Sequence, residues 1–320
     1  MQVKVADPTA AEPRIRPEPR VPPSRTAAPR WRSRKVQGLA YAAPTAVFVT
    51  VFFLLPLLLV GQMSLSDWPL LAGDRGINAP ENYTDATDTT LFWPAVRFTL
   101  LYTVIVTAVL LGLALLLALL VQESRPAAGF FRTVYFLPSA LGLASASLLF
   151  WGLYSPTTGP LSRILEDLGL VDDPVSFLGT PTSALLSTVF LIVWKFAGFY
   201  MLILLVGLQR IPHEVFEAAR MDGANRGQIF RSITLPLLRP SLALTLLLCV
   251  TGSLLAFDQF FVLTKGGPDN STVTVVQLIY REAFQRMNLG TAAALSVIVL
   301  GVLLLLNALQ FRGLRRADES

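Results

Sequence analysis

Six long apolar stretches alternate with shorter polar segments along this chain of 320 residues. Each stretch holds about the 20 apolar residues that a helix needs to cross a hydrocarbon core of ~30 Å. A soluble chain of this length would not carry several uninterrupted runs of that kind. The pattern therefore predicts an all-α membrane protein with six transmembrane helices, over residues 39–63, 95–121, 131–154, 183–208, 241–263 and 291–311.

The polar segments differ in charge, and this difference predicts how the chain is oriented. Residues 1–35 hold nine Lys/Arg and seven Pro, so we expect a disordered basic tail before a membrane domain at 36–320. Segment 211–240 holds four arginines and three more follow the last stretch, whereas residues 64–94 and 155–182 hold one each. Because cytoplasmic loops carry the excess of Lys and Arg, we expect both termini and segment 211–240 in the cytoplasm.

Composition excludes several classes of function. The chain is 53% hydrophobic and 15% charged, with a formal net charge of +5. Its arginines lie beside apolar stretches rather than on one polar face, so we expect no nucleic-acid partner. A single histidine, His213, and a single cysteine, Cys249, leave a His/Cys metal site almost no ligands and exclude an intramolecular disulfide framework. The sequence has no glycine-rich nucleotide motif, so any ATP must bind to another protein.

No set of residues suggests catalysis. His213 has no serine, cysteine and aspartate partners at a recognisable spacing. Glu217 and Asp222 could be mistaken for catalytic carboxylates, but five residues apart on a helix their directions differ by more than ~100°. Glu217 can instead pair along the helix with Arg220. We therefore expect neither an enzyme nor a cofactor of the chain's own.

Segment 211–240 is too elaborate for a plain connection. Pro212 suits the start of a helix that runs to residue 221, and Gly223 can adopt the left-handed conformation that ends a helix. Asn225 can cap a second short helix, which the pair Leu235–Pro236 would end. That helix would bury an apolar face made of Ile229, Phe230, Ile233 and Leu237. A helix, a glycine corner and a second helix predict a docking element.

This segment resembles the EAA loop of bacterial ABC importer permeases. The resemblance rests on Glu217, Ala218, Ala219, Asp222, Gly223, Ala224, Phe230, Ile233, Leu235, Pro236 and Pro240. In that family the loop is cytoplasmic and inserts a coupling helix into a groove on the ATPase subunit. The resemblance implies a type I ABC importer permease fold and a multi-pass protein of the bacterial inner membrane. It also implies three kinds of partner: a second homologous permease, two ATP-binding cassette subunits, and an extracytoplasmic solute-binding protein.

Further motifs resemble the sugar-type branch of these permeases. They lie at Trp194–Lys195 with Gly198, at residues 257–272, at 280–284 and at 288–296. They imply a permease for a sugar or a sugar-like solute. The alternatives are a permease for a polyamine, an amino acid or another non-sugar solute, and a secondary transporter that works alone. A secondary transporter would be expected to bury acids in several helices, and only Asp258 is a candidate.

A second apolar pattern follows the fifth stretch. Apolar residues recur there at steps of three and four, which is typical of an amphipathic helix. We expect this helix to lie at the outer membrane interface. Its apolar positions are Val273, Val276, Tyr280, Ala283, Phe284 and Met287.

Five residues within the apolar stretches are candidates for the solute pathway. Lys195 lies mid-stretch, where a charge costs about 2.5–3.5 kcal/mol on insertion scales. We expect it to face the bundle interior or a wet cavity, unless it snorkels to an interface. Asp258 is either an acid in a cavity or a cap at the outer end of the fifth helix. Trp194, Phe257 and Phe260 could stack on apolar sugar faces, although such aromatics also serve as packing residues.

Overall fold

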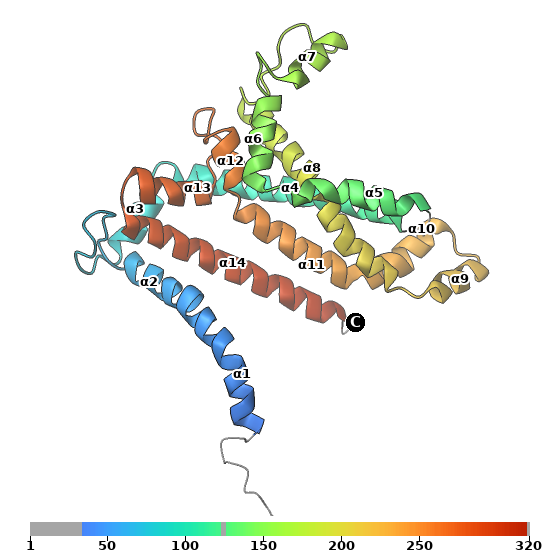
Figure 1. The fold of residues 1–320 in the computed structure, drawn as a ribbon, viewed down its shortest axis with the longest axis horizontal. Helices are drawn as coiled ribbons and strands as arrows, with labels where there is room; N and C mark the ends of the chain where they lie inside the picture. Colours follow the sequence, from blue (N-terminus) through green and yellow to red (C-terminus); the bar gives the residue numbers. More distant parts are fainter. Residues whose placement is uncertain (1–33, 123–125, 319–320) are drawn as a thin grey trace, which may run out of the picture. The chain divides into compact units, whose positions relative to one another are not determined.

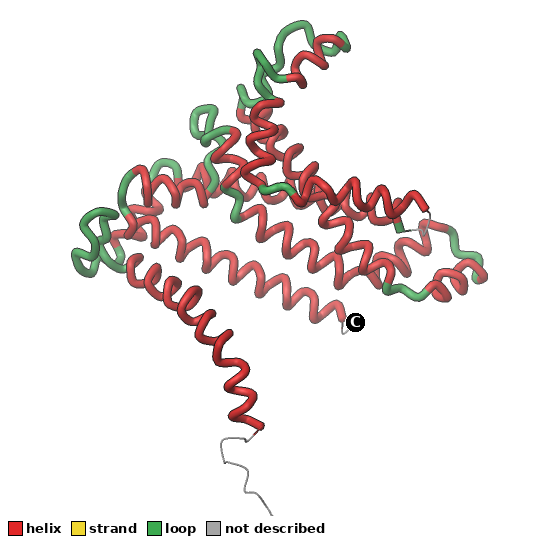
Figure 2. Tube along the Cα trace, viewed as in Figure 1, coloured by secondary structure: helices red, strands yellow, loops and turns green. Residues whose placement is uncertain are grey.

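The computed structural model describes residues 34–122 and 126–318 (Figures 1 and 2). Within these ranges the chain forms helices joined by loops, and its β-type pairing is limited to two isolated bridges. The all-α class predicted from the sequence is confirmed. The predicted basic tail lies outside the described residues, apart from Arg34 and Lys35.

The chain divides into two compact units, residues 1–55 and 56–320. In the first unit, α1 (Arg34–Val49) continues into a π-helical turn at Thr50–Leu54. The side chains from residue 38 to residue 55 are all exposed, and most of them are apolar. A helix that is apolar on all sides is typical of a segment surrounded by lipid.

The second unit is built around four long helices, α4 (Phe92–Val121), α8 (Pro181–Gln209), α11 (Leu235–Leu254) and α14 (Leu289–Asp318). α4 packs against α8 and α11, and α11 also packs against α14 (Figure 1). The core lies where α4, α8 and α11 meet. Its largest members are at most 1% exposed and include Tyr102, Leu191, Met201, Leu204 and Leu238.

Shorter helices complete this unit: α2 (Leu55–Ser64), α3 (Glu81–Asp88), α5 (Pro126–Phe136), α6 (Leu143–Leu153), α7 (Pro160–Asp167), α9 (His213–Met221), α10 (Arg226–Ile229), α12 (Asp258–Leu263) and α13 (Val275–Tyr280). A π-helical turn, Arg281–Gln285, extends α13. α9 lies at one end of the unit, and α3 and α13 lie at the opposite end (Figure 1). The segment that resembles the coupling loop is thus far from the loops of α3 and α13.

Among the described residues, five helices are long and apolar enough to cross a membrane, and a bent pair of helices could supply a sixth crossing. The helices coincide with the first, second, fourth, fifth and sixth predicted stretches. Their bounds are Gly38–Ser64, Phe92–Val121, Pro181–Gln209, Arg226–Leu263 and Leu289–Arg312.

The third predicted helix, residues 131–154, is wrong as a single straight element. Its segments Ala128–Ala140 and Leu143–Leu153 meet at 93°. A 3₁₀ turn at Leu137–Ala140 ends the first segment, and Gly142 has an extended backbone with ψ of 144°. Pro138 lies in that turn and has no N–H to continue the helix. The sequence contained this proline, but its effect depends on the helices that pack around it.

Two prolines in long helices each follow a π-helical turn, a wide turn whose hydrogen bond reaches five residues back instead of four. Pro56 lies two residues after Thr50–Leu54, and Pro236 lies two residues after the π-helical turn Phe230–Thr234. In the second turn the N–H of Leu235 donates to the carbonyl of Phe230, five residues back. A wide turn makes room for a ring that lacks an N–H and would clash with the preceding turn. The prediction that Leu235–Pro236 ends the second short helix is therefore wrong, because the helix continues into α11.

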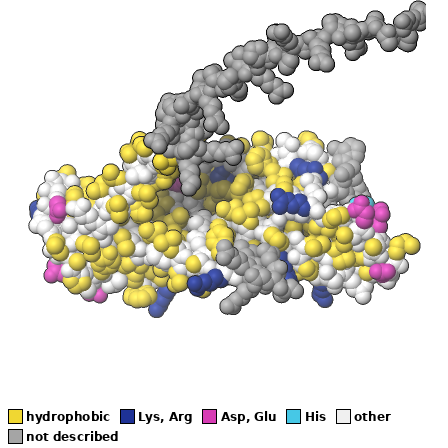
Figure 3. Space-filling model, turned by 90° about the horizontal axis from the view of Figure 1, so that it is seen from below, with side chains coloured by type: hydrophobic (Ala, Val, Ile, Leu, Met, Phe, Trp, Pro, Cys, Tyr) yellow, Lys and Arg dark blue, Asp and Glu magenta, His cyan; other side chains and the backbone are white. Residues whose placement is uncertain are grey.

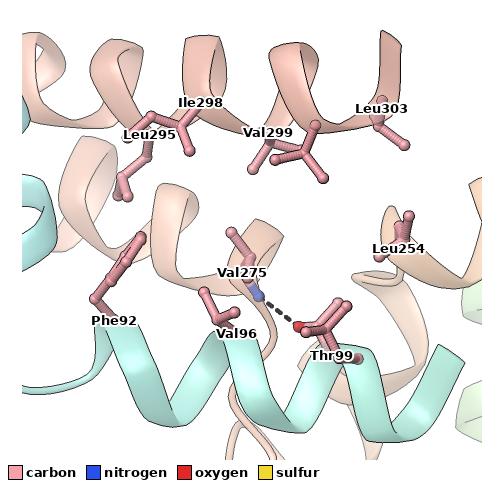
Figure 4. Close-up of a pocket in the computed structure, with 11 residues that line it drawn as sticks. Phe92, Val96, Thr99, Leu254, Val275, Leu295, Ile298, Val299 and Leu303 are labelled. Carbon is pink, nitrogen blue, oxygen red and sulfur yellow. Dashed lines mark hydrogen bonds between the residues drawn. The ribbon is translucent and has the colours of Figure 1, made fainter. Parts of the chain in front are cut away.

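Apolar side chains are spread over much of the face seen in Figure 3, and acidic side chains lie toward the ends of that face. In the second unit, α4 and α14 line an apolar pocket with Phe92, Val96 and Leu295 among its walls (Figure 4). The N–H of Val275 donates to Thr99 Oγ1 at 3.0 Å and so ties the start of α13 to α4. This lining suits hydrocarbon and offers almost nothing to a polar solute.

One glycine sets how closely α8 approaches α5. A Cβ at Gly198 would overlap the backbone carbonyl group of Tyr135. We therefore expect Gly198→Ala to destabilise the protein, because overpacking of a close contact costs about 1–3 kcal/mol. Gly112 is the matched control, since it also lies within a long helix but a Cβ added there would have no neighbour within 4 Å.

Thermal unfolding of the purified protein in detergent measures the difference. Gly198→Ala should lower the midpoint, whereas Gly112→Ala should leave it unchanged or raise it, because alanine favours a helix by about 1 kcal/mol over glycine. Equal midpoints for the two variants would show that the contact between α5 and α8 tolerates the added methyl group.

Candidate functional site

The corner after α9 is closed by a complete set of backbone hydrogen bonds. The N–H of Ala224 donates to the carbonyl of Ala219 at 3.0 Å, and the N–H of Gly223 donates to that of Arg220 at 3.1 Å. These two bonds define the Schellman motif, which needs a left-handed residue at the position of Gly223. Gly223 has φ of +81°, as the sequence predicted.

A capping box begins the next helix directly after the corner. Asn225 Oδ1 accepts from the N–H of Gln228 at 3.0 Å, and Gln228 Oε1 accepts from the N–H of Asn225 at 2.8 Å. Each side chain thus satisfies a donor that the helix end leaves free. The predicted cap at Asn225 is confirmed. Together the two motifs make a corner whose shape is set by its own residues.

α9 presents its side chains outward. None of its residues is buried, and the side chain of Glu217 is 64% exposed. The expected helix-surface partner of Glu217 was Arg220, but the structure places Glu217 Oε1 3.8 Å from Nε2 of His213 instead. At that exposure the pair contributes little to stability, so most of the Glu217 carboxylate remains available to a partner.

The other predicted coupling residues lie on both sides of the corner and differ in exposure. Ala218, Asp222 and Gly223 are exposed, whereas Ala219, Ala224, Phe230, Leu235 and Pro236 are half-buried. The predicted buried face of the second helix is wrong in part: Leu237 is 52% exposed and the neighbouring Leu238 is fully buried. The wide turn at Phe230–Thr234 rotates the residues that follow it, which moves Leu238 into the core.

A partly open cavity of about 240 Å³ lies among the helices of the second unit. α4, α6, α8 and the end of α11 line it, together with the residues that lead into α12. Phe257 and Asp258, both predicted pathway residues, are on its wall. Asp258 is exposed and begins α12, so it does not cap the fifth helix.

Three polar residues of this cavity were not identified from the sequence. Gln259 Nε2 donates to the hydroxyl of Tyr102 at 3.1 Å, and Ser253 lies nearby on the same wall. Gln259 is 2% exposed, and its Oε1 has no hydrogen-bond partner among the residues that the structure describes. A glutamine and a tyrosine within apolar stretches were the available signal, but only the fold shows that they meet.

Lys195 lies in the interior and supports the break between α5 and α6. It is 2% exposed, and its Nζ donates to the carbonyl of Ser139 at 3.3 Å and to that of Leu141. These carbonyls are free because the helix ends there. Lys195 therefore satisfies the backbone of the bend and is not on the wall of the cavity.

The remaining two predicted pathway residues are packing residues in this structure. Trp194 packs against Phe150, with ring centroids 5.2 Å apart. Phe260 is fully buried and meets Phe98 and Tyr102 edge-on, at 5.1 and 4.9 Å. Neither ring lines the cavity, whose aromatic wall residues are Phe257, Tyr102, Phe196 and Tyr200.

Residues 108–316 match the family model of the binding-protein-dependent transport system inner membrane component. The chain belongs to this family. The permease is 30% identical over 287 residues to the probable ABC transporter permease protein YurN of Bacillus subtilis, covering 89% of this chain and 98% of the relative. It is 30% identical to the multiple sugar-binding transport system permease protein MsmF of Streptococcus mutans, covering 87% and 95%.

A solved structure has the same fold as the permease. It is a bacterial alginate ABC transporter in complex with an alginate pentasaccharide-bound periplasmic protein. One chain aligns with a TM-score of 0.78 at 24% identity, covering 89% of the permease and 97% of that chain. The type I importer permease fold expected from the sequence is therefore confirmed. Members of this family are membrane transporters, and the permease is a multi-pass membrane protein.

Replacing Lys195 tests its role at the bend. We expect Lys195→Leu to lower the thermal stability of the permease and to impair transport, because each buried carbonyl left without a donor costs about 1–3 kcal/mol. Lys195→Arg keeps a cation with several donors and should recover part of the loss. Arg97→Leu, which removes an exposed cation from α4, is the control and should change stability little.

Unfolding midpoints and uptake rates of the three variants decide the matter. A Lys195→Leu variant as stable and as active as the wild type would mean that water or another group supplies the missing donors.

Proposed function

We propose that this permease is one half of the membrane pathway of an ATP-driven importer for a sugar or a sugar-like solute. The observation that carries the proposal is the exposed corner around Gly223, built on Glu217–Ala218–Ala219 in a chain of this family. The relative MsmF is named a multiple sugar-binding transport system permease, which supports a sugar as the solute. The polar groups on the cavity wall and the ring of Phe257 suit a solute with hydroxyl groups and an apolar face.

The permease is proposed to work with a second, homologous permease. Its cavity is lined by helices of one chain and opens between them. A second permease facing it would complete the walls of a pathway between the two bundles. Both permeases would lie in lipid in the bacterial inner membrane, where the apolar flanks of their long helices are satisfied.

ATP is proposed to act through two ATP-binding cassette subunits. The coupling loop, residues 211–240, would insert α9 into a groove on one of them, with Glu217 facing a basic residue. Closure of the two ATPases would draw the two coupling loops together and switch the cavity from inward-facing to outward-facing. The permease itself then performs no reaction and holds no cofactor, and it acts as a two-state element that its partners bias.

On the other side of the membrane, an extracytoplasmic binding protein is proposed to deliver the solute. The family is defined by dependence on such a protein, and the solved alginate transporter is in complex with a periplasmic one. Both termini and the coupling loop would be cytoplasmic, with residues 1–35 as a basic tail and 36–320 as the membrane domain. The loops of α3 and α7 would face outward.

Coupling through the corner is tested by Glu217→Ala and Gly223→Val in the purified transporter in lipid, with its binding protein. Both should reduce stimulated ATP hydrolysis and solute uptake at least about fivefold, because losing one partner of a buried charge pair costs about 2 kcal/mol or more. A β-branched residue at Gly223 would in addition be forced into a conformation with φ of +81°.

Matched controls lie on the same loop. Glu214→Ala removes another exposed acid of α9, and Gly227→Val changes a glycine of α10 that has no positive φ. Both should keep most of the stimulation, and all four variants should still insert into the membrane. If Glu217→Ala and Gly223→Val behaved like their controls, the corner would not be the coupling element.

Orientation is tested with single cysteines in a Cys249→Ala background. We expect Arg226→Cys to be protected from a membrane-impermeant thiol reagent added to intact cells, and Asp85→Cys and Asp172→Cys to be labelled. All three positions are exposed in the structure, so the membrane alone decides the result. Labelling of Arg226→Cys from outside would overturn the proposed topology.

A further inference from the structure

Four aromatic rings form a continuous row from the inner cavity to the end of the unit that holds α13. Phe257 stacks on Phe261 with ring centroids 5.0 Å apart, and each lies close to Tyr280, at 5.4 and 5.1 Å. Phe284 follows, 5.2 Å from Tyr280. We call these four residues the aromatic track.

The track joins two cavities. Phe257 is on the wall of the inner cavity beside Asp258 and Gln259. Phe261 and Tyr280 are on the wall of a second cavity of about 260 Å³, whose other walls are Lys265, Gln277, Arg281 and Gln285. A solute that moves from one cavity to the other would therefore keep an aromatic face beside it.

A buried glutamine lines each cavity, Gln259 the inner one and Gln277 the outer one. Each is 2% exposed, and within the described part of the chain neither Oε1 accepts a hydrogen bond. Each cavity therefore has beside it an acceptor that the described residues do not use.

The charged groups around the track differ between its ends. Asp258 supplies an acceptor at the inner cavity, whereas Lys265 and Arg281 supply donors at the outer one. Glu282, adjacent to Arg281, is engaged with Arg286 at 2.7 Å. A ligand along the track thus meets acceptors, donors and ring faces, which is the mixture that a polyhydroxylated molecule needs and an ion of one sign does not.

Hydrogen bonds hold the outer wall in place. Arg281 donates from Nη1 to Asn270 Oδ1 at 2.8 Å and from Nη2 to the carbonyl of Lys265 at 3.0 Å. They fix the turn after α12 to the segment that carries Tyr280 and Phe284. The track is therefore a preformed surface made of two elements.

An aromatic belt in lipid is the simpler explanation of exposed rings near a membrane interface. Two observations argue against it. Phe261 and Tyr280 share a cavity with Gln277, Arg281 and Gln285, whose polar groups hydrocarbon cannot satisfy. The row also begins at Phe257, a half-buried ring on the wall of the inner cavity beside Asp258 and Gln259.

We propose that the aromatic track is an entry path for saccharides, on which the apolar C–H face of a sugar ring stacks while the cavity groups bind its hydroxyls. This inference rests on the proposed function and adds to it a route by which the saccharide reaches the inner cavity. The track would receive the saccharide on the outer side and pass it to Asp258 and Gln259.

The test uses the assembled transporter in lipid nanodiscs without a binding protein. Saturation-transfer NMR is recorded with an equimolar mixture of maltotriose, lactose and diacetylchitobiose. We expect transfer to ring C–H protons of at least one saccharide. Phe284→Leu and Tyr280→Leu should each reduce it about three- to tenfold, because an aromatic contact contributes about 0.5–1.5 kcal/mol beyond its area. Tyr280→Phe keeps the ring and should retain most of it.

Phe190→Leu is the matched control, because Phe190 is 58% exposed and Phe284 is 55% exposed, but Phe190 lies outside the track. It should leave the signal unchanged. No transfer to any of the three saccharides, or equal loss in Phe190→Leu and Phe284→Leu, would overturn the track. ATP hydrolysis by the wild-type transporter with its binding protein is measured alongside. A coupled transporter without saccharide transfer overturns only the track, whereas an uncoupled one overturns the proposed function.

Discussion

Hydrogen bonding of the backbone inside hydrocarbon is the constraint on which this permease depends. A helix that breaks within a membrane leaves carbonyl groups that water cannot reach. At the bend between α5 and α6 the ammonium group of Lys195 donates to the backbone carbonyl groups of Ser139 and Leu141. Three residues further along α8, Gly198 lets the backbone of Tyr135 approach. The two positions hold α8 against α5 and the turn that ends it.

The helices and the corner were predictable from the sequence, because both depend on interactions between residues that are close in the chain. The corner needs only Gly223, Asn225 and Gln228, which lie within six residues of each other and bond to neighbouring backbone. The apolar stretches likewise indicate helices because lipid imposes the same requirement on every residue in them. In both cases the interacting groups are close in the sequence, so a short sequence pattern is enough to indicate the structure.

Long-range contacts were not predictable in this way. Tyr102 and Gln259 are 157 residues apart in sequence, and nothing in either segment indicates their hydrogen bond. Lys195 was expected in the interior, but its partners are carbonyls, which carry no side-chain signal. Pro236 was expected to end a helix because proline usually does, whereas a π-helical turn accommodates it. The apolar pattern around α13 likewise gave no sign that Tyr280 packs on Phe257 and Phe261, whereas Phe284 is 55% exposed.

Because Pro236 does not end the helix, α10, the π-helical turn and α11 form one continuous helical segment from Arg226 to Leu254. At a rise of ~1.5 Å per residue, its 29 residues reach about 43 Å. One end adjoins the corner of Gly223, and the other carries Ser253 on the cavity wall. If the corner moves with an ATPase, as proposed above, the movement would reach the cavity wall through hydrogen-bonded backbone and not across a loop.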